Sequence, residues 1–468
     1  MRGFYQIFIQ NECILLSLKR SAVQFDPKDF DHLTACPDCD LLLQKTEAPA
    51  GHSILCPRCG KTISRRNSDS IRKALALSIA GLLMYLPAML LPLMTMESFG
   101  FSDSANIIDS LFDFYNNGYY LVSFMVLLSA VIFPLMLLSS VFIISLQLYR
   151  QKYPWYLARL FRSYLHLEEW AMVEVYLLGI MVTVIKMGSS TDISYNTGIF
   201  CFTGLVLLTI ALAAAIDRDF FWQTIEDKKQ KNNAPVAAQP PVVVHASDGG
   251  IVTAAMQGLS QCHICHKLSP TNHGTKKCPR CGEPLHLRHP SSISKTWALV
   301  LTSTIFLAPA NLLPIMRVDF LGVPSRSTIM DGIIYFFQHG SYFIGLIIFT
   351  ASVLVPIFKI VGLTILLLST RPCSNRLLRQ RAKMFRFITF IGRWSMLDIF
   401  VIALLSVLVN FGFFTSIHAA PAATYFCIVV ASTMFAVITF DPRLIWDRCS
   451  QPQQAGSKNS RITSGNNP

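Results

Sequence analysis

Long apolar runs occur in two groups of four along this chain, and polar segments separate the groups. The first group covers residues 74–96, 119–148, 170–187 and 198–216, and the second covers residues 297–316, 342–369, 395–414 and 421–440. Several runs reach the roughly 18–20 residues that a helix needs to cross a hydrocarbon core. The pattern predicts an all-α polytopic membrane protein with about eight transmembrane helices in two repeated four-helix units.

Polar segments set the expected domain boundaries. We expect a disordered leader at 1–35, a first cysteine module at 36–66, transmembrane unit 1 at 74–222, a linker at 223–260, a second cysteine module at 261–290, transmembrane unit 2 at 295–448 and a disordered tail at 449–468. The linker is rich in Lys, Pro and Ala and cannot bury a core. Gln6, Gln10 and Glu12 interrupt the apolar part of the leader, whereas a signal peptide needs an unbroken one.

The two halves repeat one another. The segment YLPAMLLPLM at 85–94 matches LAPANLLPIM at 307–316, and the run Trp170–Glu174 matches Trp394–Asp398. Each repeat is one cysteine module followed by four helices. An even number of spans brings the chain back to the side where it began, so the repeats are parallel and not inverted.

Two Cys-x-x-Cys pairs precede each transmembrane unit. The predicted metal ligands are Cys36, Cys39, Cys56, Cys59, Cys262, Cys265, Cys278 and Cys281. A two-residue spacer aims both sulfurs at one ion, and two such knuckles complete a tetrahedral thiolate site. Paired knuckles in basic, cytosol-like segments favour metal over disulfides. We therefore expect two structural zinc ribbons, with rubredoxin-type iron as the alternative.

The distribution of charge predicts orientation. The chain has a net charge of +13, and only 14% of its residues are charged, against roughly 25% in soluble domains. Lys and Arg gather in the loops 149–169 and 371–394 and are absent from 97–118, 188–197 and 415–420. The positive-inside rule then places both termini and both ribbons in the cytoplasm. Few aromatic residues alternate with the basic ones, so we expect no nucleic-acid binding.

Four charged residues fall inside predicted spans: Glu174, Lys186, Lys359 and Asp398. A charge at the centre of a membrane helix costs about 2.5–3.5 kcal/mol on insertion scales, which makes such residues functional candidates. Lys359 lies deepest, and we expect it to join a buried polar network. For the other three, an interfacial or snorkelling charge is the competing interpretation.

Prolines near or inside the spans predict helix ends and kinks. Proline lacks an N–H group, so nearby carbonyls need other partners. The candidates are Pro87, Pro92, Pro134, Pro309, Pro314 and Pro356.

The chain carries no motif for nucleotide hydrolysis. The segment Gly60-Lys61-Thr62 resembles the end of a phosphate-binding loop, but Leu55 stands where that loop requires glycine. We therefore expect no enzymatic activity and, specifically, no ATPase.

Several separated motifs resemble the paraquat-inducible protein A family over residues 36–448. They are the duplicated ribbon and four spans, the LLP segment near span ends, the run Gly392–Asp398, and Phe440-Asp441-Pro442-Arg443-Leu444 with Trp446. The resemblance implies a Gram-negative inner-membrane subunit of a phospholipid transport system. Its implied partners are a periplasmic tunnel protein with mammalian-cell-entry (MCE) domains and an outer-membrane lipoprotein.

Two other functions remain open from the sequence. A membrane redox or stress sensor would use iron or labile zinc in the ribbons. A passive anchor would hold the periplasmic partner without moving lipid.

Overall fold

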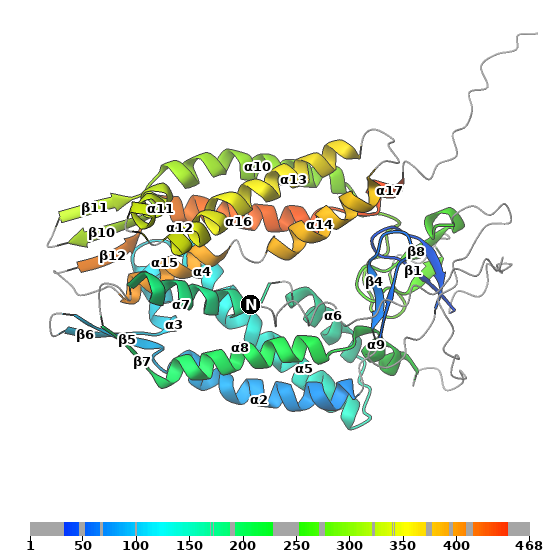
Figure 1. Ribbon diagram of the computed structural model, residues 1–468. Helices are drawn as coiled ribbons and strands as arrows, with labels where there is room; N and C mark the ends of the chain where they lie inside the picture. Colours follow the sequence, from blue (N-terminus) through cyan, green and yellow to red (C-terminus); the bar gives the residue numbers. More distant parts are fainter. Residues whose placement is uncertain are drawn as a thin grey trace, which may run out of the picture.

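Figure 1 shows the protein as a computed structural model. The structure describes residues 32–45, 52–65, 69–98, 101–168, 170–171, 173–187, 192–227, 252–270, 277–320, 323–338, 340, 342–370, 377–392, 396–408 and 415–447. The predicted tail, most of the leader and most of the linker lie outside these ranges.

Transmembrane unit 1 contains helices that run between two ends of the molecule, with a small sheet at one end (Figure 1). Its elements are α2 (Ser70–Leu90), β5 (Met94–Ser98), β6 (Phe101–Ala105), α3 (Ile107–Asn116), α4 (Tyr120–Val126), η1 (Leu127–Ile132), α5 (Phe133–Tyr149), α6 (Leu157–Leu167), α7 (Val173–Met187), β7 (Asp192–Tyr195), α8 (Thr197–Ala215) and α9 (Arg218–Asp227).

Transmembrane unit 2 repeats this order of elements. It contains α10 (Ser292–Leu312), β10 (Met316–Phe320), β11 (Val323–Ser327), α11 (Ile329–Gln338), α12 (Tyr342–Phe349), η3 (Thr350–Leu354), α13 (Val355–Ser369), α14 (Leu378–Gly392), α15 (Leu397–Leu408), β12 (Thr415–Ala419), α16 (Pro421–Thr439) and α17 (Leu444–Asp447). The structure thus confirms a mostly helical, duplicated membrane fold.

Six helices in the described part of the chain are long and apolar enough to cross a membrane. They are residues 70–90, 120–149, 197–215, 292–312, 345–369 and 421–439. Within the described residues, the third predicted span of each unit is a shorter helix, namely α7 with 15 residues and α15 with 12. These two helices pack against each other between the units. Gly179 permits the approach, since a Cβ there would lie 3.3 Å from the Cβ of Phe400.

Each unit carries a three-stranded antiparallel sheet that the hydropathy pattern did not predict. The strand orders are β6-β5-β7 and β11-β10-β12, with Met94 paired to Ala105 and Tyr195 in the first sheet. Pro92 and Pro314 follow the ends of α2 and α10. A residue before proline disfavours the helical conformation, so the chain leaves each helix extended and enters β5 or β10.

The long second helix of each unit contains one π-helical segment. It is η1 in unit 1 and η3 in unit 2, and Pro134 or Pro356 follows it within the first two positions of the next α-helix. Proline cannot donate the backbone hydrogen bond that an α-helix would form at this point. The π-helical segment lies in the turn where that bond is missing, and the helix continues past the proline. Pro87 and Pro309 lie within the last turn of their helices.

In each unit the first long helix packs along the last long one, α2 along α8 and α10 along α16, and the same hydrogen bonds close both pairs. The Ser70 hydroxyl donates to the carbonyl of Ala215 at 2.6 Å and accepts from the N–H of Asp217 at 3.0 Å. The Ser292 hydroxyl donates to Thr439 at 2.7 Å and accepts from Asp441 at 3.0 Å. The repeat therefore extends to side-chain contacts between distant elements.

Candidate metal centres and their docking on the membrane units

All four cysteine pairs lie in tight turns of one local design. The first three turns connect β1 (Leu33–Ala35) to β2 (Leu42–Gln44), β3 (Ser53–Leu55) to β4 (Thr62–Arg65), and β8 (Leu259–Gln261) to β9 (Leu268–Pro270). The residue after the second cysteine has a positive φ in every turn, at Asp40, Gly60, His266 and Gly282. Its N–H donates to the carbonyl of the first cysteine at 2.8–3.1 Å. This left-handed turn brings both sulfurs of a pair to one side.

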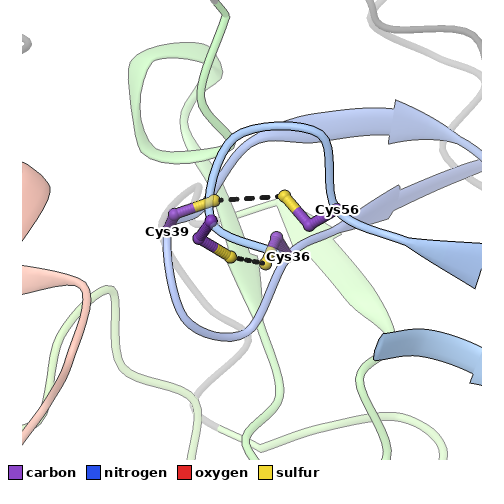
Figure 2. A group of neighbouring side chains, drawn as sticks. Cys36, Cys39 and Cys56 are labelled. Carbon is purple, nitrogen blue, oxygen red and sulfur yellow. Dashed lines mark hydrogen bonds between the residues drawn. The ribbon is translucent and has the colours of Figure 1, made fainter. Parts of the chain in front are cut away.

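The first cluster brings Cys36, Cys39, Cys56 and Cys59 together (Figure 2). The Sγ atoms of Cys36 and Cys59 are 3.4 Å apart, and those of Cys39 and Cys56 are 3.5 Å apart. Both separations exceed the roughly 2.05 Å of a disulfide. Four sulfurs about 2.3 Å from one ion lie about 3.8 Å apart in a tetrahedron, so this spacing suits a metal.

The second cluster reproduces this geometry. The Sγ atoms of Cys262 and Cys281 are 3.5 Å apart, and those of Cys265 and Cys278 are 3.4 Å apart. In each cluster all ligand atoms lie within 4.8 Å of one another, and all the cysteines are buried. Four thiolates on one ion would fill a tetrahedral shell and leave no position for water or substrate.

Crowding of the thiols makes a fully ionised cluster unfavourable without a cation. Hydrogen bonding to Cys36 raises the pKa of Cys39, and hydrogen bonding to Cys262 raises the pKa of Cys265. A divalent ion removes this cost because it binds the deprotonated sulfurs. The donor set and its spacing therefore fit a metal ion such as zinc.

The two ribbons form one joint domain at the end of the helices opposite the sheets (Figure 1). Leu42 donates a backbone hydrogen bond to Val252 at 3.0 Å, and Ala254 donates one to Asp40 at 3.0 Å. The side chain of Gln261 donates to the carbonyl of Ala35 at 2.6 Å. Apolar side chains from both ribbons and from the predicted linker just before ribbon 2 complete a small shared core, namely Ala35, Leu42, Val252, Ala254, Leu259 and Leu268. The two ribbons therefore pack against each other, while each has its own four-cysteine site.

Ribbon 1 docks on transmembrane unit 2, although it precedes unit 1 in the sequence. Arg386 of α14 donates to the carbonyl of Cys59 at 2.7 Å and lies 3.8 Å from the carboxylate of Asp38. The guanidinium of Arg58 lies over the ring of Trp446 in α17, 4.6 Å from its centroid.

Ribbon 2 docks in the same way on transmembrane unit 1. Arg162 of α6 donates to the carbonyl of Cys281 at 3.4 Å and pairs with Glu283 at 3.2 Å. Glu226 of α9 accepts from both Lys267 and Arg280. Each unit thus contacts the ribbon of the other half, in an exchanged docking, and ribbon 2 contacts its own unit as well.

An arginine bridge joins both ribbons to unit 2. Arg288 contacts Asp40 of ribbon 1 at 2.9 Å and Asp447 of α17 at 2.6 Å. Burial of Arg288 opposes its charge, but the two carboxylates outweigh that effect and raise its pKa.

A buried ion pair lies at the junction between α16 and ribbon 2. Arg443 donates to both carboxylate oxygens of Asp441 at 2.9–3.0 Å, and the two residues are 2% and 0% exposed. Asp441 also accepts from the N–H of His289 at 3.1 Å, while Arg443 lies 2.9 Å from the ring nitrogen of His263. His263 therefore belongs to a buried contact and not to an open loop.

The sequence did not predict these docking residues, but it carried a signal for two of them. The second knuckle of both ribbons reads Cys-Pro-Arg-Cys, and its arginine is Arg58 or Arg280. Each donates to a carbonyl of its own ribbon, Cys39 at 3.2 Å or Cys265 at 3.3 Å, and also contacts a membrane unit. An arginine repeated between two metal ligands indicates such a double contact.

The intramembrane charges do not form one visible cluster among the described side chains. Lys359 is fully buried on α13, and Glu174 is partly exposed in the first turn of α7. The side chains of Lys186 and Asp398 lie outside the described residues.

The match to a known protein family covers the same two halves of the chain. The family model described as "Paraquat-inducible protein A" matches residues 71–226 and again 293–450, which correspond to the two transmembrane units. The chain belongs to the paraquat-inducible protein A family.

Relatives cover almost the whole length of the chain. It is 31% identical to "Intermembrane transport protein PqiA" of Escherichia coli K12, over 89% of this chain and 96% of that protein. It is 32% identical to "Lipophilic envelope-spanning tunnel protein A" of the same strain, over 88% and 90%. A "Probable intermembrane transport protein" of Haemophilus influenzae is 28% identical, over 88% and 95%. No solved structure matches the chain.

Proposed function

We propose that this chain is the inner-membrane subunit of an intermembrane phospholipid transport system of a Gram-negative bacterium. One observation carries the proposal: a duplicated membrane fold that aligns over 89% of its length with a relative named as an intermembrane transport protein. The subunit would load or receive lipid at the base of a periplasmic tunnel and so support the outer membrane. No chemical step is assigned to it.

The metal centres would serve as structural supports for this function. We propose zinc, with two ions per chain, because each cluster offers four buried thiolates and no open position. The ions would hold a joint cytoplasmic domain that ties the two membrane units together through the exchanged docking.

The proposed orientation places both ribbons in the cytoplasm and both sheets in the periplasm. The Lys and Arg of the loops at the ribbon end support it. A reporter fused after Ala105, at the end of β6, is expected to be active only as a periplasmic reporter. Cytoplasmic activity of the same fusion would reverse the orientation.

The proposed partner is a periplasmic tunnel protein with MCE domains, joined by an outer-membrane lipoprotein. The test is an affinity pull-down of the tagged chain from native membranes, with mass spectrometry of proteins and lipids. Co-purification of such a tunnel protein with phospholipid is the expected result. A chain that emerges alone from a mild detergent would instead favour the sensor function.

The energy source proposed for transport is the proton gradient, with Glu174, Lys186, Lys359 and Asp398 as relay candidates. Lys359→Ala and Asp398→Asn are each expected to abolish rescue of the envelope defect of a deletion strain. The reason is that a relay fails when one titratable group is lost. Leu137 occupies the position of Lys359 in unit 1, so Leu137→Ala is the matched truncation and should retain rescue. Full rescue by both relay variants would refute this mechanism.

A further inference from the structure

A pocket lies beside the π-helical segment of unit 2, near the sheet end of the bundle. It is a small hollow of about 60 Å³ that is partly open to the surroundings. Its walls come from α11, α12, η3 and α15, from the start of β10, and from one residue of unit 1, Val182 on α7. Ile329, Phe336 and Val401 are typical of its lining, which is almost entirely apolar.

Glycine makes the space at one wall. A Cβ at Gly332 on α11 would meet no described atom of a facing element within 4 Å. The repeat aligns Asp109 with Asp331, so Ser110 occupies the equivalent position in unit 1. Ser110 is fully buried, and its hydroxyl donates to the carbonyl of Asn106 at 3.2 Å. The two units therefore differ here: side-chain atoms fill the position in unit 1, and it is open in unit 2.

A second wall carries an unused hydrogen-bond donor. Ser352 on η3 is 1% exposed and lines the pocket, and its hydroxyl has no partner among the described residues. Most other hydroxyls inside the long helices donate to a carbonyl three or four residues earlier, as Ser303 and Thr364 do at 2.7 and 2.8 Å. A buried hydroxyl without a partner is unfavourable, because it has lost its hydrogen bonds to water. Ala130 aligns with Ser352 in unit 1, so this donor is particular to the unit that has the opening.

We propose that this pocket binds one acyl chain of an ester-linked lipid, with the Ser352 hydroxyl donating to an ester carbonyl. The inference rests on the proposed transport function and names a place where the lipid is held. The hydrocarbon of the acyl chain suits the apolar walls, because it removes their surface from water. The ester carbonyl accepts a hydrogen bond and carries no charge, which suits the described lining, whose polar side chains are the hydroxyls of Ser352 and Thr328.

The surroundings of the pocket favour an acyl chain over the other ligands that could enter it. A protein helix would need a wider groove than the opening beside one glycine, and its unpaired backbone ends would need further partners. A water cluster would need two to four polar partners per molecule, whereas Ser352 and Thr328 are the polar side chains of the lining. Acyl chains are abundant around the helices that form it.

The test uses the full-length chain in lipid vesicles containing a phospholipid with a diazirine on one acyl chain. Cross-linked peptides mapped by mass spectrometry are expected to come from α11, η3 and α15. Gly332→Leu fills the open space and is expected to remove this labelling, while Gly332→Ala retains most of it. The matched control is Gly204→Leu on α8, where a Cβ also meets no atom within 4 Å, and its labelling should equal that of the wild type.

Ser352→Ala separates binding from folding, because the two effects have opposite signs. Loss of an unpaired buried hydroxyl should leave thermal stability unchanged or raise it. Loss of a hydrogen bond to the ester should reduce labelling about threefold to tenfold. A probe with ether-linked chains has no ester carbonyl, so the wild type and Ser352→Ala should label equally with it.

Three outcomes overturn the inference. They are cross-linked peptides that map outside α11, η3 and α15, labelling of these helices that survives Gly332→Leu, or a loss of labelling in Gly204→Leu as large as that in Gly332→Leu. If the wild type meanwhile restores the envelope of a deletion strain and co-purifies with its tunnel partner, only the pocket assignment fails. Pocket labelling in a chain that neither restores the envelope nor has such a partner would instead refute the proposed transport function.

Discussion

Replacing Cys36 and Cys39 together by serine is expected to remove one metal ion from the chain. Unit 2, rather than unit 1, should then become sensitive to proteolysis. Structural zinc contributes about 10–16 kcal/mol to the folding of isolated zinc-finger peptides, so ribbon 1 should not keep its fold without the ion. The exchanged docking determines which membrane unit is affected. Ribbon 1 holds α14 through Arg386 and α17 through the contact of Arg58 with Trp446.

Metal analysis and limited proteolysis measure this result in the same preparation. The metal content should fall by half, and new cleavage should appear in and around α14. Replacing Cys262 and Cys265 should give new cleavage near α6 and α9, and also near α17, because His263 and Arg288 contact unit 2 there. Cys201→Ser is the matched control, since Cys201 belongs to neither cluster. New cleavage at α6 in the ribbon 1 variant would contradict the exchanged docking.

Removing either partner of the Asp441–Arg443 pair is expected to destabilise the chain by about 3–5 kcal/mol, because the other charge stays buried and unpaired. Both side chains are almost fully buried, and His289 and His263 add contacts to the pair. Asp441→Asn and Arg443→Gln should each lower the thermal midpoint in detergent, and the double variant should recover part of the loss.

Unit 1 provides the control for this experiment. Asp217 occupies the position of Asp441, but Asp219 stands where unit 2 has Arg443. Asp217 accepts from the N–H of Phe220 at 3.0 Å at the start of α9. Asparagine caps a helix about as well as aspartate, so Asp217→Asn should cost well under about 1 kcal/mol. Equal losses in the two units would show that the arginine contributes little.

The same pair gives a pH dependence of stability. Burial would raise the pKa of Asp441, but hydrogen bonds from Arg443 outweigh it and hold the pKa at about 2. The pKa of an unfolded aspartate is about 3.9, so the folded state binds the proton less tightly. The contribution of the pair is therefore complete above the unfolded value and is lost as the pH falls towards 2.

Sequence patterns predicted the features that depend on neighbours along the chain. The cysteine clusters are one example, because a two-residue spacer fixes both sulfurs of a pair and two pairs complete a tetrahedral set. The membrane class is another, since hydropathy over one helix length decides whether a segment can lie in hydrocarbon. The duplication was also visible, because both halves keep the same motifs in the same order. The locations of the leader, linker and tail remain predictions.

Local pattern could not predict the sheets, since β7 and β12 join partners about a hundred residues away. Apolar content located the segments that form α7 and α15. It did not show that these helices pack against each other between the units.

The amino-acid sequence by itself determined that this is a duplicated membrane protein with two four-cysteine sites. Tertiary structure alone decided which membrane helices each ribbon contacts and that a pocket lies beside Gly332. The docking of Arg386 on Cys59 joins residues 327 positions apart, and no local preference encodes that distance. The opening beside Gly332 likewise depends on packing, because one glycine leaves space only where the facing helices do not fill it.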